Sequence, residues 1–320
     1  MARDWPGAAG LVAGYALDEL FGDPRRFHPV AGYGRCAATL EKAFFAPTRP
    51  RGAVFATVAV GVPVAVAALA QRATGRRPLT RFALTAAATW AVLGGRSLRQ
   101  EGHRLASTLE CDDLGRARQL LPNLCGRDPR ALGAAELTRA ATESVAENTS
   151  DAVVAPLFWG ALLGLPGLVG YRAVNTLDAM VGHRSRRYER FGTAAARLDD
   201  AANLVPSRLT ALLTVGLGGS PRRTWATWRR DGSRHPSPNS GQCESAFAGA
   251  LGIRLGGTNV YFGRTETRPT LGSGPAPTPV HLRHAARLSG LIGLASLALA
   301  AAYRATRRAR RAPGKAESWI

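Results

Sequence analysis

The sequence predicts an all-α protein, a polytopic helical bundle embedded in a membrane, and three observations favour this class. Of the 320 residues, 46% are hydrophobic, which is ample for a core. The apolar residues fall in charge-free blocks rather than in an even amphipathic pattern. Two blocks, 52–71 and 152–171, are long enough to cross the hydrocarbon of a bilayer. We expect a single membrane-embedded helical domain over 1–320, with polar loops at 96–151, 172–208 and 222–287.

Four other charge-free blocks are shorter than a straight span, so each could be a buried helix, an interfacial helix or a span with a charge near one end. In chain order they are 5–17, 82–95, 209–221 and 288–303. The strong block 152–171 is interrupted by Leu163-Gly164-Leu165-Pro166-Gly167. In lipid, such a break is tolerated only where protein or a wet cavity satisfies the freed backbone groups. A re-entrant or broken helix at 152–171 is therefore an alternative to a single crossing.

The formal net charge of +20 comes almost wholly from arginine, because Lys42 and Lys315 are the only lysines. Arginine clusters could bind nucleic acid, or they could anchor loops against anionic lipid and phosphate-bearing ligands. The sequence has no zinc-finger spacing and no aromatic RNP pattern, so we expect membrane lipid and no nucleic acid as a partner. The basic tail around Arg304 and Arg311 predicts a multi-pass protein of the cell membrane whose C-terminus is cytoplasmic.

Three acidic residues, Glu143, Glu147 and Asp151, precede the apolar block 152–171. In a helix they recur at i, i+4 and i+8, which puts all three carboxylates on one face. Like charges stacked in this way repel, so they usually gain a cation, a basic partner or a raised pKa. A solvated acidic face at a helix start is the alternative interpretation.

More polar residues follow the block. Asn175 and Asp178 lie three residues apart, and a straight crossing would hold them about 30 Å from the acidic triplet. A single site built from both segments therefore requires a hairpin at 152–171. Asp199 and Asn203 are spaced i and i+4 and could jointly hold a hydrated magnesium ion, although a solvated, capped helix is the alternative.

These segments resemble, in order, the adenosylcobinamide-phosphate synthase family of cobalamin biosynthesis, which consists of integral membrane proteins. The resemblance covers most of the chain, and long uninterrupted motifs carry it. They are Gly22-Asp23-Pro24, His28-Pro29, Arg96-Ser97-Leu98, Gly126-Arg127-Asp128, 143–151, Ala155-Pro156-Leu157-Phe158, 173–178, 196–200, 235–239 and Arg254-Leu255-Gly256-Gly257.

The resemblance implies an ATP-dependent amide synthesis that joins adenosylcobyric acid to (R)-1-aminopropan-2-yl phosphate, giving adenosylcobinamide phosphate. ATP would convert a propionate carboxylate to an acyl phosphate, which the uncharged amine then attacks. Such a site needs magnesium, basic groups for the phosphates and a base for the ammonium proton. The alternatives are a non-catalytic membrane regulatory or sensory protein on the same scaffold, and a transporter. The oligomeric state stays open.

Residue chemistry then assigns roles for such a reaction. Metal binding or proton abstraction falls to carboxylates, and phosphate contacts fall to guanidinium groups, which pair with phosphate bidentately. The predicted catalytic residues are Glu143, Glu147, Asp151 and Asp178. The predicted magnesium ligands are Glu147, Asp151, Asp199 and Asn203. The residues predicted to bind ATP and substrates are Arg172, Asn175, Arg184, Arg197, His235 and Asn239.

Overall fold

The computed structural model describes residues 4–23, 28–75, 77–183, 185–261 and 264–306. The described chain is mostly helical, as predicted. Its α-helices are α1 (Trp5–Phe21), α2 (Pro29–Phe44), α3 (Arg49–Ala73), α4 (Pro78–Val92), α5 (Gly95–Glu110), α6 (Leu114–Leu120), α7 (Ala134–Thr149), α8 (Ala155–Leu163), α9 (Leu165–Leu177), α10 (Thr193–Leu217), α11 (Pro221–Asp231), α12 (Ser240–Leu251) and α13 (Pro279–Thr306). A 3₁₀ turn, η1 (Leu121–Asn123), and two π-helical turns, η2 (Ser150–Val154) and η3 (Asp178–Gly182), complete them.

The all-α class needs one correction, because an antiparallel β-hairpin lies within the predicted loop 222–287. It consists of β1 (Leu255–Tyr261) and β2 (Arg264–Leu271). The β-formers are Thr258, Val260 and Tyr261 in β1 and three threonines in β2, and a bulge between Leu255 and Gly257 shifts the register of the two strands. All three predicted polar loops contain helices in the structure, among them α5 to α7, most of α10, and α11 with α12.

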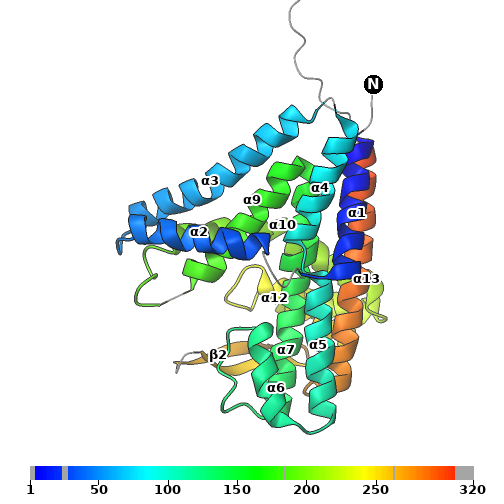
Figure 1. The fold of residues 1–320 in the computed structure, drawn as a ribbon. Helices are drawn as coiled ribbons and strands as arrows, with labels where there is room; N and C mark the ends of the chain where they lie inside the picture. Colours follow the sequence, from blue (N-terminus) through cyan, green and yellow to red (C-terminus); the bar gives the residue numbers. More distant parts are fainter. Residues whose placement is uncertain (1–3, 24–27, 76, 184, 262–263, 307–320) are drawn as a thin grey trace, which may run out of the picture.

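The elements form two halves along one long axis (Figure 1). We call one the apolar half; it contains α1, α3, α4, the α8–α9 pair and the C-terminal part of α13. The other, which we call the charged half, contains α5, α6, α7, the β-hairpin and the N-terminal part of α13. The end of α13 lies beside the start of α1, where Arg304 pairs with Asp4 (Nη2–Oδ2 2.8 Å). The described ends of the chain therefore lie at the tip of the apolar half.

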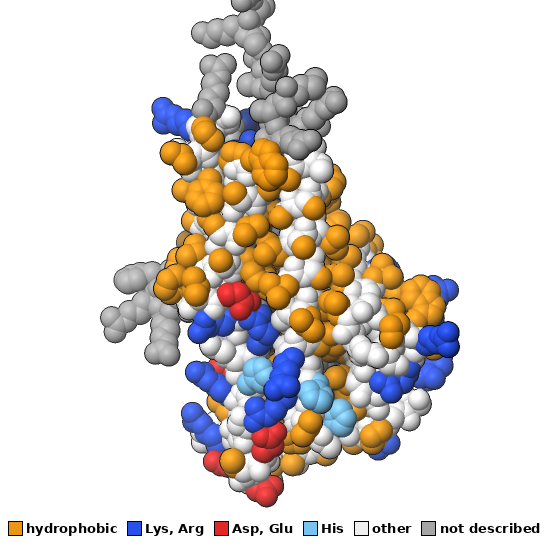
Figure 2. Space-filling view, turned by 90° about the vertical axis from the view of Figure 1, so that its right-hand side faces the viewer, with side chains coloured by type: hydrophobic (Ala, Val, Ile, Leu, Met, Phe, Trp, Pro, Cys, Tyr) orange, Lys and Arg blue, Asp and Glu red, His pale blue; other side chains and the backbone are white. Residues whose placement is uncertain are grey.

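The surface differs between the two halves. In Figure 2, apolar side chains cover most of the apolar half, and acidic, basic and histidine side chains gather on the charged half. Within the described residues, two helices are long and apolar enough to span a membrane, α3 and α13. Only 22% of the most apolar window of α3 is buried inside the protein, so α3 is not a core helix of the usual soluble kind. Both helices support membrane association.

The block 152–171 forms a helical hairpin, so the predicted break in it is confirmed. Helix α8 ends at Gly164, whose φ of 75° lies in the left-handed region that glycine tolerates. The side chain of Gln71 on α3 satisfies the freed backbone groups: it accepts from the Leu165 amide (2.9 Å) and donates to the Leu163 carbonyl (3.3 Å). A Cβ added to Gly167 would lie 2.0 Å from the Trp159 carbonyl oxygen, so the two helices pack backbone to backbone.

The largest apolar core lies in the charged half, between α5, α7, α12 and α13. Leu105, Leu137, Phe247 and Leu282 contribute one side chain from each helix, and all four are fully buried. This core fixes α7 and α12 against each other. The polar ends of both helices consequently face the boundary between the two halves.

Candidate active site

The aspartate cluster, which we define as Asp151, Asn175, Asp178, Asp199 and Asn203, lies where the two halves meet. Asp151 is in η2, Asn175 in α9 and Asp199 in α10. The hairpin brings the first two together although they are 24 residues apart. The Asn175 amide nitrogen lies 3.5 Å from Asp151 Oδ2 and 3.3 Å from Asp199 Oδ1, so a single amide bridges two carboxylates.

Buried polar groups orient these carboxylates. The Tyr171 hydroxyl lies 2.9 Å from Asn203 Oδ1 and 3.4 Å from Asp151 Oδ1. Asn203, which is 1% exposed, donates from its amide to Asp199 Oδ2 (3.1 Å). Both oxygens of Asp199 therefore accept from an asparagine amide. Asp151 and Asp199 are therefore linked twice, once through Asn175 and once through Tyr171 and Asn203.

Burial raises the pKa of each aspartate in the cluster, and neighbouring carboxylates add to the effect. The pKa of Asp178 rises to about 7, first through burial and then through Asp199 and Asp200. The pKa of Asp199 rises to about 6, mainly through burial, although its bonds from Asn175 and Asn203 act against the rise. The pKa of Asp151 lies well above its ordinary value for the same reasons. Bringing in a cation would relieve this repulsion.

Arg172 supplies the positive charge beside the cluster. Its guanidinium donates to Asn175 Oδ1 (3.2 Å) and to the Val92 carbonyl. Its Nε is buried and has no hydrogen-bond partner among the described residues. A buried guanidinium with an unused donor suits a phosphate or carboxylate oxygen, which agrees with the predicted role of Arg172.

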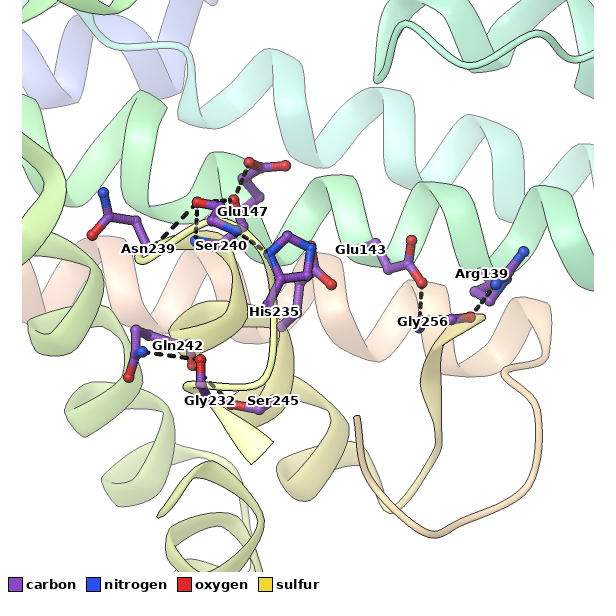
Figure 3. A network of polar contacts seen from close by, with 12 residues as sticks. Arg139, Glu143, Glu147, Gly232, His235, Asn239, Ser240, Gln242, Ser245 and Gly256 are labelled. Atoms are coloured by element: carbon purple, nitrogen blue, oxygen red, sulfur yellow. Dashed lines mark hydrogen bonds and ion pairs between the residues drawn. The ribbon is translucent and has the colours of Figure 1, made fainter. Parts of the chain in front are cut away.

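A second polar group, which we call the histidine pocket, contains Glu143, His235 and Glu244. Figure 3 shows the first two of these residues with Glu147 and Ser240. Glu143 pairs with Arg127 and accepts from the Gly256 amide of β1 (2.7 Å). His235 Nδ1 accepts from the Ser237 amide (3.1 Å), and His235 Nε2 lies 3.9 Å from Glu244 Oε1. Both side chains of this last pair are almost fully buried.

Glu147 lies between the aspartate cluster and the histidine pocket. Its Oε1 accepts from the Ser240 hydroxyl at the start of α12 (2.5 Å). Its charge raises the pKa of Asp151, Asp178 and Asp199 on one side and that of Glu244 on the other. The two groups are therefore electrostatically linked through a single side chain.

The helical spacing predicts that the acidic triplet shares one face of a helix, and in the structure its three carboxylates have different partners. Glu143 enters the histidine pocket, Glu147 lies in the middle and Asp151 enters the aspartate cluster. Eight residues of helix separate the first from the last by about 12 Å, and the π turn η2 changes the direction of Asp151. The α8–α9 hairpin brings Asn175 to Asp151, the last residue of the triplet, as the single-site interpretation required.

The chemistry of the aspartate cluster fits magnesium, which takes one or two carboxylates together with waters and phosphate oxygens. Asp151 and Asp199 are two such carboxylates, held close by one amide. Within the described ranges, no three His, Cys, Asp or Glu side chains lie close enough to chelate an ion by themselves. The side-chain oxygen of Asn203 accepts from Tyr171 and its amide donates to Asp199. In this geometry Asn203 therefore orients the Asp199 carboxylate. The full predicted ligand set stays a prediction.

Other predicted residues have different surroundings. Asn239 is buried, donates to the Asp200 carbonyl (2.8 Å) and accepts from Ser207 (3.2 Å), so it ties the 232–239 loop to α10. Arg197 is exposed on α10; burial raises the pKa of Asp200, and the charge of Arg197 acts against that rise. Arg184 lies outside the described residues.

Several residues in these two groups were missed by sequence reasoning. Tyr171 ends an apolar block and looks like a core side chain, yet its hydroxyl joins two members of the cluster. Glu244 has no spacing in the sequence that sets it apart from an ordinary helical residue. Arg127 belongs to the Gly126-Arg127-Asp128 motif, which was a usable signal. Nothing in the local spacing connects it with Glu143.

The comparisons with known proteins agree with the resemblance seen in the motifs. The family model described as CobD/Cbib protein matches residues 11–312. The cobalamin biosynthesis protein CobD of Mycobacterium tuberculosis H37Rv is 53% identical over 289 residues, which cover 89% of this chain and 92% of the relative. The protein of the same name from Geobacter metallireducens is 45% identical (85% and 88% covered), and that from Rhodobacter capsulatus is 40% identical (88% and 92%). No solved structure matches the chain.

Proposed function

The chain belongs to the CobD/CbiB family of cobalamin biosynthesis, and from this premise we propose that it is an ATP-dependent, amide-forming ligase. Its corrinoid substrate would be adenosylcobyric acid, and its amine substrate (R)-1-aminopropan-2-yl phosphate. The products would be adenosylcobinamide phosphate, ADP and phosphate. The observation that carries the proposal is the aspartate cluster with Arg172, where buried carboxylates and an unused guanidinium donor meet.

The cluster suits the phosphates of ATP. Asp151 and Asp199 would hold Mg²⁺, which when bound would neutralise charge on the phosphate oxygens. Asn203 and Tyr171 hold these two carboxylates in fixed directions through their hydrogen bonds. Arg172 would donate its unused Nε–H to a phosphate oxygen from the other side.

The reaction also needs a group that removes a proton from the ammonium of the amine substrate. Asp178 is suited to this role, because its pKa of about 7 lets it accept a proton near neutral pH. Its carboxylate lies against Gly182, where an added Cβ would come within 1.8 Å of Oδ1. The glycine therefore leaves room for Asp178 in its present position. Glu147, whose charge contributes to the raised pKa of Asp178, is a second candidate for the base.

We further propose that the apolar half lies in the cell membrane and that the charged half faces the cytoplasm. The exposed apolar side chains of α3 and α13 support the first statement. ATP is cytoplasmic, which supports the second. If the apolar half crosses the bilayer completely, the basic C-terminal tail then lies on the opposite side from ATP. In that case the predicted cytoplasmic C-terminus and a cytoplasmic site exclude each other, and we favour the cytoplasmic site.

The test is an assay of the purified full-length protein for ADP formation that requires both adenosylcobyric acid and the aminopropanol phosphate. We expect Asp199→Asn to lower the rate at least about a hundredfold, because it removes a charged ligand of a phosphate-bound cation. The matched control is Asp112→Asn, which changes an exposed aspartate in the turn between α5 and α6 and should retain normal activity.

Two outcomes would contradict the ligase. A wild-type protein that forms no ADP with both substrates present, yet is folded and inserted, would favour the non-catalytic regulatory interpretation. Full activity of Asp199→Asn would remove the aspartate cluster from the reaction and leave the ligase without its proposed magnesium site.

A further inference from the structure

The histidine pocket contains a hydrogen-bond donor and an acceptor that are both buried and both unused. His235 is 8% exposed and Glu244 is 1% exposed. His235 Nε2 and Glu244 Oε2 have no hydrogen-bond partner among the described residues. Such groups cost free energy when left unpaired, so in a native protein each one calls for an explanation.

The tautomer of His235 follows from its surroundings. The Ser237 amide donates to Nδ1, so the ring proton of neutral His235 is on Nε2. Burial and the charge of Arg268 lower the pKa of His235, which keeps the ring neutral. The unused atom is therefore an N–H donor, and it lies 3.9 Å from Glu244 Oε1, too far for a hydrogen bond.

The charges around Glu244 favour a cation. Glu143 and Glu147 raise its pKa after burial does, whereas Arg268 and Arg127 act in the opposite direction. Three carboxylates thus face two guanidinium groups, and Arg127 is already paired with Glu143. The ionised form of Glu244 would be stabilised by a positively charged group that reaches its free oxygen.

A vicinal amino alcohol matches this arrangement. Its ammonium and its oxygen are joined through two carbon atoms and lie about 3 to 4 Å apart. The ammonium can donate to a carboxylate while the oxygen accepts from an imidazole N–H, which are the two functions left unused here. Pro236 and Pro238, which follow His235 in the chain, are exposed and Glu147 is partly exposed, so residues adjoining the pocket reach the surface.

We propose that the histidine pocket is the binding site for the amino alcohol unit of the amine substrate, with the ammonium on Glu244 and the adjacent oxygen at His235 Nε2–H. This inference rests on the proposed ligase function. It assigns the amine substrate to residues on the opposite side of Glu147 from the aspartate cluster. His235 and Glu244 then recognise the amine and the aspartate cluster binds ATP. Of the two bases named above, Glu147, which lies between the two groups, is then the one that acts on the bound ammonium, in place of Asp178.

The experiment measures binding to the purified full-length protein in detergent by titration calorimetry, without ATP. The two probes are (R)-1-aminopropan-2-yl phosphate and propane-1,2-diol 2-phosphate, which carries a hydroxyl in place of the ammonium. We expect the wild type to bind the amine at least about tenfold more tightly than the diol, the scale of one charge-assisted hydrogen bond. Glu244→Gln should reduce that preference to within about twofold, and His235→Phe should weaken both probes.

One control keeps the test specific. Glu189→Gln, which changes an exposed carboxylate with no partner in the described structure, should retain the preference. Since the readout is a ratio of two affinities measured on the same sample, a partly unfolded variant does not imitate the loss.

The outcomes separate this inference from the ligase proposal. Equal affinity of the wild type for both probes, or an unchanged preference in Glu244→Gln, overturns the amine site even if ADP is formed normally. A preference that depends on Glu244 supports the site even if no ligation is detected, in which case the proposed ligase fails alone.

Discussion

At the scale of single residues, Asn175 has the most consequential position, because its amide bridges two aspartates whose charges repel. Its hydrogen bond lowers the pKa of Asp199 against the effect of burial. Arg172 in turn holds the amide in its orientation through Oδ1. Asn175 therefore helps to keep Asp199 ionised and ready for a cation.

This position gives a prediction for the variant Asn175→Ala. Without the amide donor, the pKa of Asp199 rises above about 6, so a larger fraction is protonated near neutral pH. We expect the acidic limb of the pH–rate profile of ADP formation to move to higher pH, with activity recovering in alkaline buffer. Asn175→Gln, which keeps the amide, should show a smaller displacement. Identical pH profiles for the wild type and Asn175→Ala would contradict this role.

At the scale of structural elements, the α8–α9 hairpin decides which residues meet. It returns the chain after nine residues of α8, so that Asn175 and Tyr171 come back to Asp151. The break depends on Gly164 in its left-handed conformation and on Gly167, whose missing side chain lets α9 approach Trp159. Gln71 fixes the turn from outside the hairpin.

The hairpin predicts a strong effect of Gly167→Ala. The new Cβ would lie 2.0 Å from the Trp159 carbonyl oxygen, which belongs to the backbone and cannot rotate away. We expect the variant to lose several degrees in Tm and most of its ATP-dependent activity, because α9 must move away from η2. The control is Gly61→Ala in α3, where no atom lies within 4 Å and alanine favours a helix. Comparable Tm values for the two variants would refute the tight crossing.

At the scale of the whole molecule, pH and magnesium should act together on stability. The pKa values of Asp178 and Asp199 are about 7 and about 6 in the folded protein, against 3.8 in the unfolded chain. Between these limits the folded chain binds more protons than the unfolded chain, so the free energy of unfolding falls as pH rises. We expect a higher Tm near pH 5.5 than near pH 8, and a larger stabilisation by Mg²⁺ at the higher pH.

The matching variant is Asp178→Asn, which removes the most strongly shifted of the two groups and should flatten the dependence of Tm on pH. Thermal unfolding in detergent with and without Mg²⁺ measures both effects. A Tm that rises steadily from pH 5.5 to pH 8 without the metal would show that these carboxylates are not destabilising in their ionised form.

The division into an apolar and a charged half predicts a topology. A reporter active only in the cytoplasm, fused within the surface loop between α5 and α6, should be active, because that loop lies at the end of the charged half. The same reporter fused after Thr306 should be inactive if the apolar half crosses the bilayer. Activity at both positions would show that the apolar half enters the membrane from one side only, and would agree with the cytoplasmic tail expected from its arginines.

The sequence by itself determined the helical class, the apolar blocks and the break at 163–167, because these depend on local composition and on glycine and proline. The same spacing rules identified neighbours along single helices, namely Glu147 with Asp151, Asn175 with Asp178 and Asp199 with Asn203. Only the tertiary structure decided which pairs face each other, since Tyr171 and Asn203, or Arg127 and Glu143, meet through contacts between separate helices. It also separated Glu143 from Asp151, because a carboxylate is directed by the helix packed opposite it and not by its spacing alone.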